Sequence, residues 1–168
     1  MIALLAIASF PAALIIAAMN DIYEFKIPNY VPVLLGAGFL VTSLALRADA
    51  RIVLDCLMIA TAALVVGFGL FARRIIGAGD AKLFAATMLW VGSSAIIPFL
   101  FNIAIGSVIL TLSLLVFRKA PAFPVYAQAP WLLRLHQEPK DIPYAVAICI
   151  AGLLTFPELV FFRLAFIG

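Results

Sequence analysis

The chain has 168 residues, of which 67% are hydrophobic and only 11% are charged. Soluble domains carry about 25% charged residues, so this composition excludes an ordinary soluble protein and predicts an all-α integral membrane protein. The length leaves no room for a separate soluble domain of usual size, and we expect one membrane-embedded domain over residues 1–168. The formal net charge of +3 requires no nucleic-acid partner, because membrane proteins concentrate Lys and Arg in their cytoplasmic loops.

Six apolar stretches predict a polytopic protein with six transmembrane helices. Each stretch approaches the roughly 20 apolar residues that a spanning helix needs. The first has no basic n-region and ends in Asn-Asp, so we interpret it as a retained span and not as a cleaved signal peptide. The fourth is short, and the Trp-Val-Gly-Ser-Ser sequence at its end predicts a tight turn that joins it to the fifth as a hairpin. The stretches lie near Ile2–Met19, Ile27–Leu46, Ile52–Phe71, Ile76–Val91, Ala95–Phe117 and Ile142–Phe162.

Lys and Arg residues are distributed unequally between the two sides of the predicted membrane protein. Eight belong to the side that holds the first, third and fifth connections, and three belong to the other side. The positive-inside rule therefore places the first side in the cytoplasm and both termini outside. The eight are Lys26, Arg73, Arg74, Lys82, Arg118, Lys119, Arg134 and Lys140, and the three are Arg47, Arg51 and Arg163.

The longest connection, residues 118–143, contains repeated prolines that exclude one continuous helix. Within it, Trp131–His136 is the one stretch that could form an amphipathic turn at the membrane surface. Because this stretch is short, we expect a loop with interfacial anchors instead. The sequence assigns this connection no role.

Residues typical of metal, thiol and serine chemistry are isolated in this chain. Cys56 and Cys149 lie far apart in apolar stretches, and His136 has no Cys or His neighbour. The sequence has no Cys-x-x-Cys, His-Glu-x-x-His or Gly-x-Ser-x-Gly motif. The Gly-Ala-Gly sequence at residues 77–79 lacks the third glycine and the βαβ context of a nucleotide loop. We therefore expect no metal and no cofactor.

Two aspartates lie at predicted membrane boundaries, both on the predicted cytoplasmic side. Asp21 follows the first apolar stretch, and Asp80 lies in Gly-Ala-Gly-Asp-Ala-Lys at the start of the fourth. Either acid alone could end or cap a helix, but acids in membrane segments are usually functional. If the first and fourth helices pack together, both carboxylates can reach one water and share a proton. One acid would then activate the water while the other polarises a peptide carbonyl, as in an aspartyl protease.

Six further residues flank the acids and are candidates for substrate binding or support of the site. The glycines weaken a helix and suit a sharp bend or the close approach of another chain. Lys82 lies two positions beyond Asp80 and should point away from it on a helix. We expect Lys82 to contact the interface or the substrate, and a snorkelling cytoplasmic anchor is an equal alternative. The six are Gly77, Gly79, Lys82, Lys26, Asn29 and Glu24.

These motifs resemble those of the prepilin peptidases, a family of membrane aspartyl proteases. Residues 77–82 match the Gly-x-Gly-Asp-x-Lys signature, and Asp21 followed by Lys-Ile-Pro-Asn at 26–29 matches the first motif. Asp-Ile-Pro-Tyr-Ala at 141–145 resembles the Ile-Pro-Tyr-Gly entry to the last helix. Ala145 replaces that glycine, and Lys26 stands where arginine is common, which bears on packing and substrate contact. The resemblance implies that Asp21 and Asp80 are the catalytic pair.

The resemblance is closest to the short CpaA/TadV-like form, which serves Flp (type IVb) pili. It implies a peptidase without the N-terminal zinc and methyltransferase part of the longer enzymes. The implied substrate is a prepilin or pseudopilin, whose short basic leader is cut after a glycine. Cleavage is implied at the cytoplasmic face of the bacterial inner membrane, in contact with lipid. The oligomeric state is not predicted.

Two interpretations without protease activity stay open. A pilus-assembly membrane protein could retain the motifs without catalysis. A small proton- or cation-coupled transporter could use Asp21 and Asp80 as ion sites. Such a transporter should show inverted repeats with matching broken helices, and the sequence contains no matching pair. Cleavage of a leader peptide by the purified protein would separate the protease from both.

Overall fold

The computed structural model describes residues 2–119, 130–137 and 142–166, and this part of the chain is almost entirely helical. Lys140, one of the eight basic residues of the predicted cytoplasmic side, and Asp141, the first residue of the third motif, lie outside these ranges. Apolar stretches become helices because a helix satisfies every backbone N–H and C=O internally, as lipid requires. The elements are α1 (Ile2–Glu24), α2 (Tyr30–Ala45), α3 (Ala50–Ala72), α4 (Ala78–Val91), α5 (Ile96–Lys119), α6 (Pro130–Gln137), α7 (Tyr144–Thr155), the 3₁₀ helix η2 (Phe156–Glu158) and α8 (Val160–Phe166).

Three of the described helices, α1, α3 and α5, are long and apolar enough to cross a membrane. Together α7 and α8 would make a fourth span, although they are bent by 43° at the break between them. The shorter α4 has 14 residues and extends about 21 Å, whereas the hydrocarbon core is about 30 Å thick. The described part of the chain is therefore helical and holds three candidate membrane spans, or four if the bent pair is one span, as expected of a membrane protein. Six spans are not established by length and composition.

Two predicted helices differ in extent or continuity from those of the structure. The predicted span Ile142–Phe162 is interrupted by η2, because Pro157 has no N–H for the helical ladder and its ring clashes with the preceding turn. The first helix continues beyond Met19 to Glu24. Asp21 therefore lies within the last turns of α1 and not after its end.

The long connection contains a helix that the sequence analysis expected to be a loop. Trp131–His136 lies within α6. The Arg118 Nε of α5 donates to the Leu135 carbonyl at 2.9 Å, and the Trp131 ring meets Tyr23 of α1 edge-on, with centroids 5.4 Å apart. A helix this short is unstable in isolation, so contacts with α1 and α5 determine its structure.

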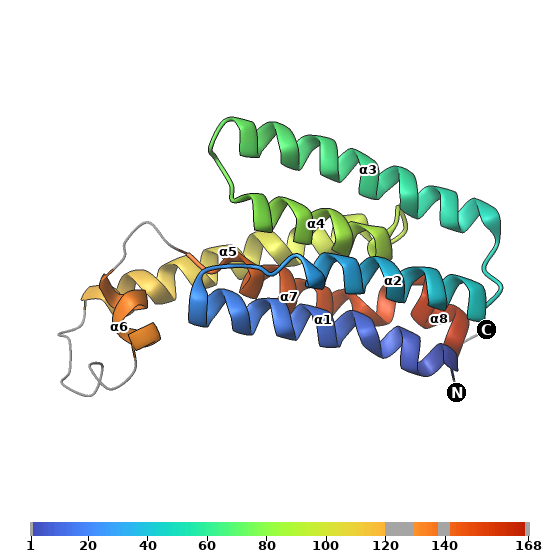
Figure 1. The fold of residues 1–168 in the computed structure, drawn as a ribbon, viewed down its shortest axis with the longest axis horizontal. Coiled ribbons are helices and arrows are strands. Elements are labelled where there is room, and N and C mark those ends of the chain that lie inside the picture. The colour runs from blue at the N-terminus through green and yellow to red at the C-terminus, as the bar shows by residue number, and fades with distance from the viewer. Residues whose placement is uncertain (1, 120–129, 138–141, 167–168) are drawn as a thin grey trace.

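The helices α1, α2, α5 and α7 form the body of the bundle, and α3 lies to one side (Figure 1). α1 packs on α2 and α7, α5 packs on α7, and α4 packs on α3 and α2. Near the C-terminal end of α4, the fully buried Trp90 donates its indole N–H to the Leu35 carbonyl at 2.9 Å. The rings of Phe10, Phe39 and Phe161 surround it. This aromatic cluster fixes α4 against α1, α2 and α8.

The two ends of the bundle differ in charge. The α1–α2 and α3–α4 connections, α6 and the start of α7 lie at one end, on the left of Figure 1, whereas both termini lie at the other. We call the first the loop end. Its described basic residues are Lys26, Arg73, Arg74, Lys82, Arg118, Lys119 and Arg134, and those toward the opposite end are Arg47, Arg51 and Arg163.

Candidate active site

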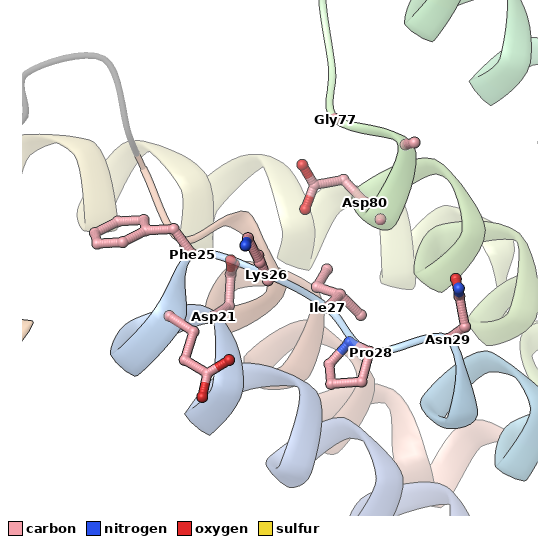
Figure 2. Close-up of a pocket in the computed structure, with 11 residues that line it drawn as sticks. Asp21, Phe25, Lys26, Ile27, Pro28, Asn29, Gly77 and Asp80 are labelled. Atoms are coloured by element: carbon pink, nitrogen blue, oxygen red, sulfur yellow. The ribbon is translucent and has the colours of Figure 1, made fainter.

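One pocket at the loop end brings Asp21 and Asp80 together. It has a volume of about 530 Å³ and lies between the last turn of α1, the segment Phe25–Asn29 and the first turn of α4. Figure 2 shows the two side chains at this pocket, Asp21 from α1 and Asp80 from α4. An adjoining pocket of about 430 Å³ is lined by both acids and by Arg74 and Tyr144. The two carboxylates therefore line the same open space.

The two acid-bearing helices contact each other through the rings of Phe10 in α1 and Trp90 in α4, but each packs mainly on other helices. Among the described elements, α1 packs mainly on α2 and α7, and α4 packs mainly on α3 and α2. Both α2 and α7 contact each of the two acid-bearing helices. These shared neighbours place Asp21 and Asp80 at one pocket while leaving space between the helices.

Asp21 is almost fully buried, with 6% of its surface exposed. Its Oδ2 accepts a hydrogen bond from the backbone N–H of Ala145 at 2.9 Å. This N–H belongs to the first turn of α7, where the N-cap residue Pro143 makes no side-chain cap. Asp21 thus supplies a partner to an N–H that has none within α7, and a carboxylate here complements the positive end of the helix dipole. The first and third sequence motifs meet in this bond.

Asp80 lies in the first turn of α4 and is partly exposed. Its carboxylate folds back toward the N-cap residue Gly77. A Cβ placed on Gly77 would lie 2.9 Å from Asp80 Oδ2, which is too close for a stable contact. Because Gly77 has no side chain, the Asp80 carboxylate can lie over the start of α4.

The segment after α1 is folded across the pocket by two local features. Phe25 has a left-handed φ of 52°, and its N–H donates to the Asp21 carbonyl at 3.0 Å, so α1 ends and the chain turns. Ile27 then packs on α4 at Gly79, where a Cβ would lie 3.2 Å from Ile27 Cβ. Gly79 thus lets a side chain of the same chain approach the backbone of α4.

Of the other candidate residues, Lys82 and Asn29 contact each other. Lys82 Nζ donates to Asn29 Oδ1 at 3.0 Å, which ties the segment before α2 to α4. The sequence analysis did not predict this partner for Lys82. Lys26 and Glu24 are exposed and line the pocket, so one positive and one negative side chain lie at its mouth.

Several residues that line the site were not predicted from the sequence. Arg74 has a left-handed φ of 58° where α3 ends, and it lines the adjoining pocket with Phe25 and Tyr144. The Ile-Pro-Tyr-Ala sequence indicated that Tyr144 and Ala145 belong to a motif. Their position beside Asp21 depends on the packing of α7 on α1, and no local pattern reveals that packing.

The acid–base groups that both pockets share are the carboxylates of Asp21 and Asp80. Within the described residues, no group of three or more His, Cys, Asp or Glu could hold a metal ion. Both cysteines, Cys56 and Cys149, are buried, and neither lines these pockets. The arrangement suits proton transfer between a water, two carboxyl groups and a bound peptide.

Comparison with known proteins agrees with this geometry. The sequence matches the model of the type IV leader peptidase family over residues 8–115, which is more than half of the chain and includes both acids. No curated protein and no solved structure matches the chain. The family match indicates a protease that acts on prepilin-type substrates. With two acids at one open pocket and helices that can span a membrane, the chain belongs to the type IV leader peptidase family.

Proposed function

We propose that the chain is a membrane aspartyl endopeptidase, which removes the short basic leader from a prepilin or pseudopilin, with Asp21 and Asp80 as its catalytic pair. The observation that carries this proposal is the open pocket lined by both acids. Two carboxyl groups at one site can hold a single shared proton. One group is then available as a base and the other as an acid.

The proposed reaction needs only these two groups and one water. The ionised carboxylate takes a proton from water, the water oxygen bonds to the scissile carbonyl carbon, and the protonated acid gives its proton to the carbonyl oxygen. In the second step the C–N bond breaks. The leaving nitrogen takes the proton from the first acid, and the second acid takes a hydroxyl proton back from the intermediate. The products are a free carboxyl group and an amine, and the acid pair returns to its starting state.

Further parts of the proposal concern the substrate and the orientation in the membrane. A basic leader suits the pocket itself, because its lining includes three acidic side chains and one basic side chain, Lys26. The excess of Lys and Arg at the loop end supports a cytoplasmic location for the pocket, in the bacterial inner membrane. A six-span arrangement and a role as the short CpaA/TadV-like form serving Flp pili rest on the apolar stretches and the motifs.

Cleavage of a defined peptide tests the catalytic assignment. The substrate is a synthetic prepilin peptide with a basic leader, a glycine and about 20 apolar residues, incubated with the full chain in lipid vesicles. The wild type should release the leader, and Asp21→Asn and Asp80→Asn should not. Asp49→Asn, a change of an exposed residue that lines neither pocket, serves as the matched control. Normal cleavage by either pocket variant would reject its role, and an inert wild type would favour a non-catalytic assembly protein.

Thiol labelling tests the orientation. In a chain without Cys56 and Cys149, single cysteines are introduced as Ser94→Cys and Arg134→Cys, both at exposed positions. A membrane-impermeant reagent added to intact spheroplasts should label position 94, and it should label position 134 only after the membrane is opened. Labelling of position 134 in intact spheroplasts would place the pocket on the wrong face for a leader held in the cytoplasm.

A further inference from the structure

A third cavity continues from the active-site pockets into the apolar part of the bundle. It has a volume of about 280 Å³ and lies between α4, α5 and α7. Asp80 forms part of its wall, and Ile75, Ile76 and Tyr144 line both this cavity and the adjoining active-site pocket. We call it the deep cavity. It is continuous with the site because four residues, one of them a candidate catalytic acid, belong to both.

The deep cavity extends away from the loop end. Its wall includes Phe84, one helical turn beyond Asp80 along α4, and Ile148, one turn beyond Tyr144 along α7. Ser107, at the middle of α5, contributes a small side chain. The cavity therefore reaches from Asp80 toward the centre of the bundle, and most of its wall is apolar.

We propose that the deep cavity binds the apolar side chain that immediately follows the scissile bond of the substrate, and this inference rests on the proposed function. A prepilin has a basic leader on one side of the bond and an apolar membrane segment on the other. The pocket at the loop end is lined by three acidic side chains, Glu24 among them, and by one basic side chain, Lys26, which suits a basic leader. The membrane segment must then run the other way, along α4 and α5. With the scissile carbonyl at Asp80, the next side chain falls at the cavity that has Asp80 in its wall.

The packing of the helices supports an occupant that enters from the side. α4 packs mainly on α3 and α2, whereas α5 packs mainly on α7, so direct packing between α4 and α5 does not fill the cavity that both helices line. At its edge Ile75 is 62% exposed. An apolar side chain gains by leaving water for such a cavity, whereas a charged one would lose its hydration against a wall that is mostly apolar. The expected occupant is a large apolar side chain.

The inference is tested with two peptides that differ only after the cleaved glycine, one with Phe and one with Ala. Ser107→Leu fills the cavity, and Ser113→Leu makes the same change at an exposed position of α5 that lines none of the pockets described above. Wild type should prefer the Phe peptide in kcat/KM. Ser107→Leu should reduce that preference at least about tenfold, because one methylene in an apolar pocket already changes kcat/KM by roughly that factor and Leu is larger than Ser by more than one methylene. Ser113→Leu should leave it unchanged.

A second variant separates loss of the cavity from loss of folding. Ile103→Ala enlarges the same wall and should increase cleavage of a peptide with Trp after the glycine, relative to the Phe peptide. If Ser107→Leu abolishes all cleavage, this comparison decides the question. Unchanged preferences in Ile103→Ala, or in an active Ser107→Leu enzyme, would overturn the inference while leaving the peptidase assignment intact. A wild type that cleaves neither peptide would instead refute the proposed function.

Discussion

Asp21 has a structural contact as well as a proposed catalytic role, and two substitutions separate them. Its Oδ2 accepts the backbone N–H of Ala145 at the start of α7. Asp21→Asn keeps an oxygen of the same size at that position but removes the acid. Asp21→Ala removes both the acid and the acceptor. Both variants should lose leader cleavage, whereas their stabilities should differ.

The expected difference in stability follows from the burial of this bond. Asp21 is 6% exposed and Ala145 is fully buried, so in Asp21→Ala the amide loses this acceptor where water has little access. Leaving a buried donor without a partner costs about 1–3 kcal/mol, and loss of a helix N-cap costs about 1 kcal/mol. The two free-energy costs overlap, because both describe the loss of the acceptor of the same N–H. We expect Asp21→Ala to lower the free energy of unfolding by about 1–3 kcal/mol. Asp21→Asn keeps this acceptor and should lose the interaction with the helix dipole, about 0.3–1 kcal/mol.

The assay combines reversible unfolding in detergent with cleavage of the synthetic prepilin peptide. Asp49→Ala is the matched control, because Asp49 caps α3 by accepting the Arg51 N–H at 2.7 Å in an exposed position. It should cost about 1 kcal/mol and retain cleavage. Equal stability of Asp21→Ala and Asp21→Asn would refute the cap at α7. Wild-type cleavage by Asp21→Asn would refute the catalytic role and leave the cap in place.

Three further outcomes are expected from the geometry of the site. Gly77→Ala should lower kcat at least tenfold with little change in expression, because the added Cβ would lie 2.9 Å from Asp80 Oδ2 and must displace that carboxylate. An unchanged kcat would show that the carboxylate is not held there for catalysis. Lys82→Met and Asn29→Ala should each destabilise the segment before α2. The loss of unfolding free energy in the double variant should be smaller than the sum of the two single losses, because both variants remove the same 3.0 Å bond. Strictly additive losses would contradict this coupling. The pH profile of kcat/KM should be bell-shaped, because acid protonates the group that must be ionised and base removes the proton of the other; activity that rises to a plateau with pH would contradict the shared-proton mechanism.

Sequence alone determined the membrane class and most of the helices. Apolar runs of this length exclude an ordinary soluble protein. In lipid, a single segment can satisfy the hydrogen bonds of its own backbone N–H and C=O groups by forming a helix. The starts and ends of α3 and α5 accordingly lie within two residues of the predicted stretches. Both acids and their flanking motifs were also recognised, because their residue types and spacing are local properties of the chain.

Tertiary structure decided how these pieces meet. The bond from Ala145 to Asp21 joins residues 124 positions apart, and it exists because α7 packs on α1. Helix α6 forms because Arg118 and Tyr23 hold it from two other helices. The sequence shows a proline at position 157, but it does not predict that the helix breaks there. Transmembrane helices tolerate proline when neighbouring groups satisfy the freed backbone groups. The deep cavity likewise depends on how α4, α5 and α7 come together, because all three helices line it. Such contacts depend on shape and on several helices at once, whereas periodicity and motif spacing report only on one segment at a time.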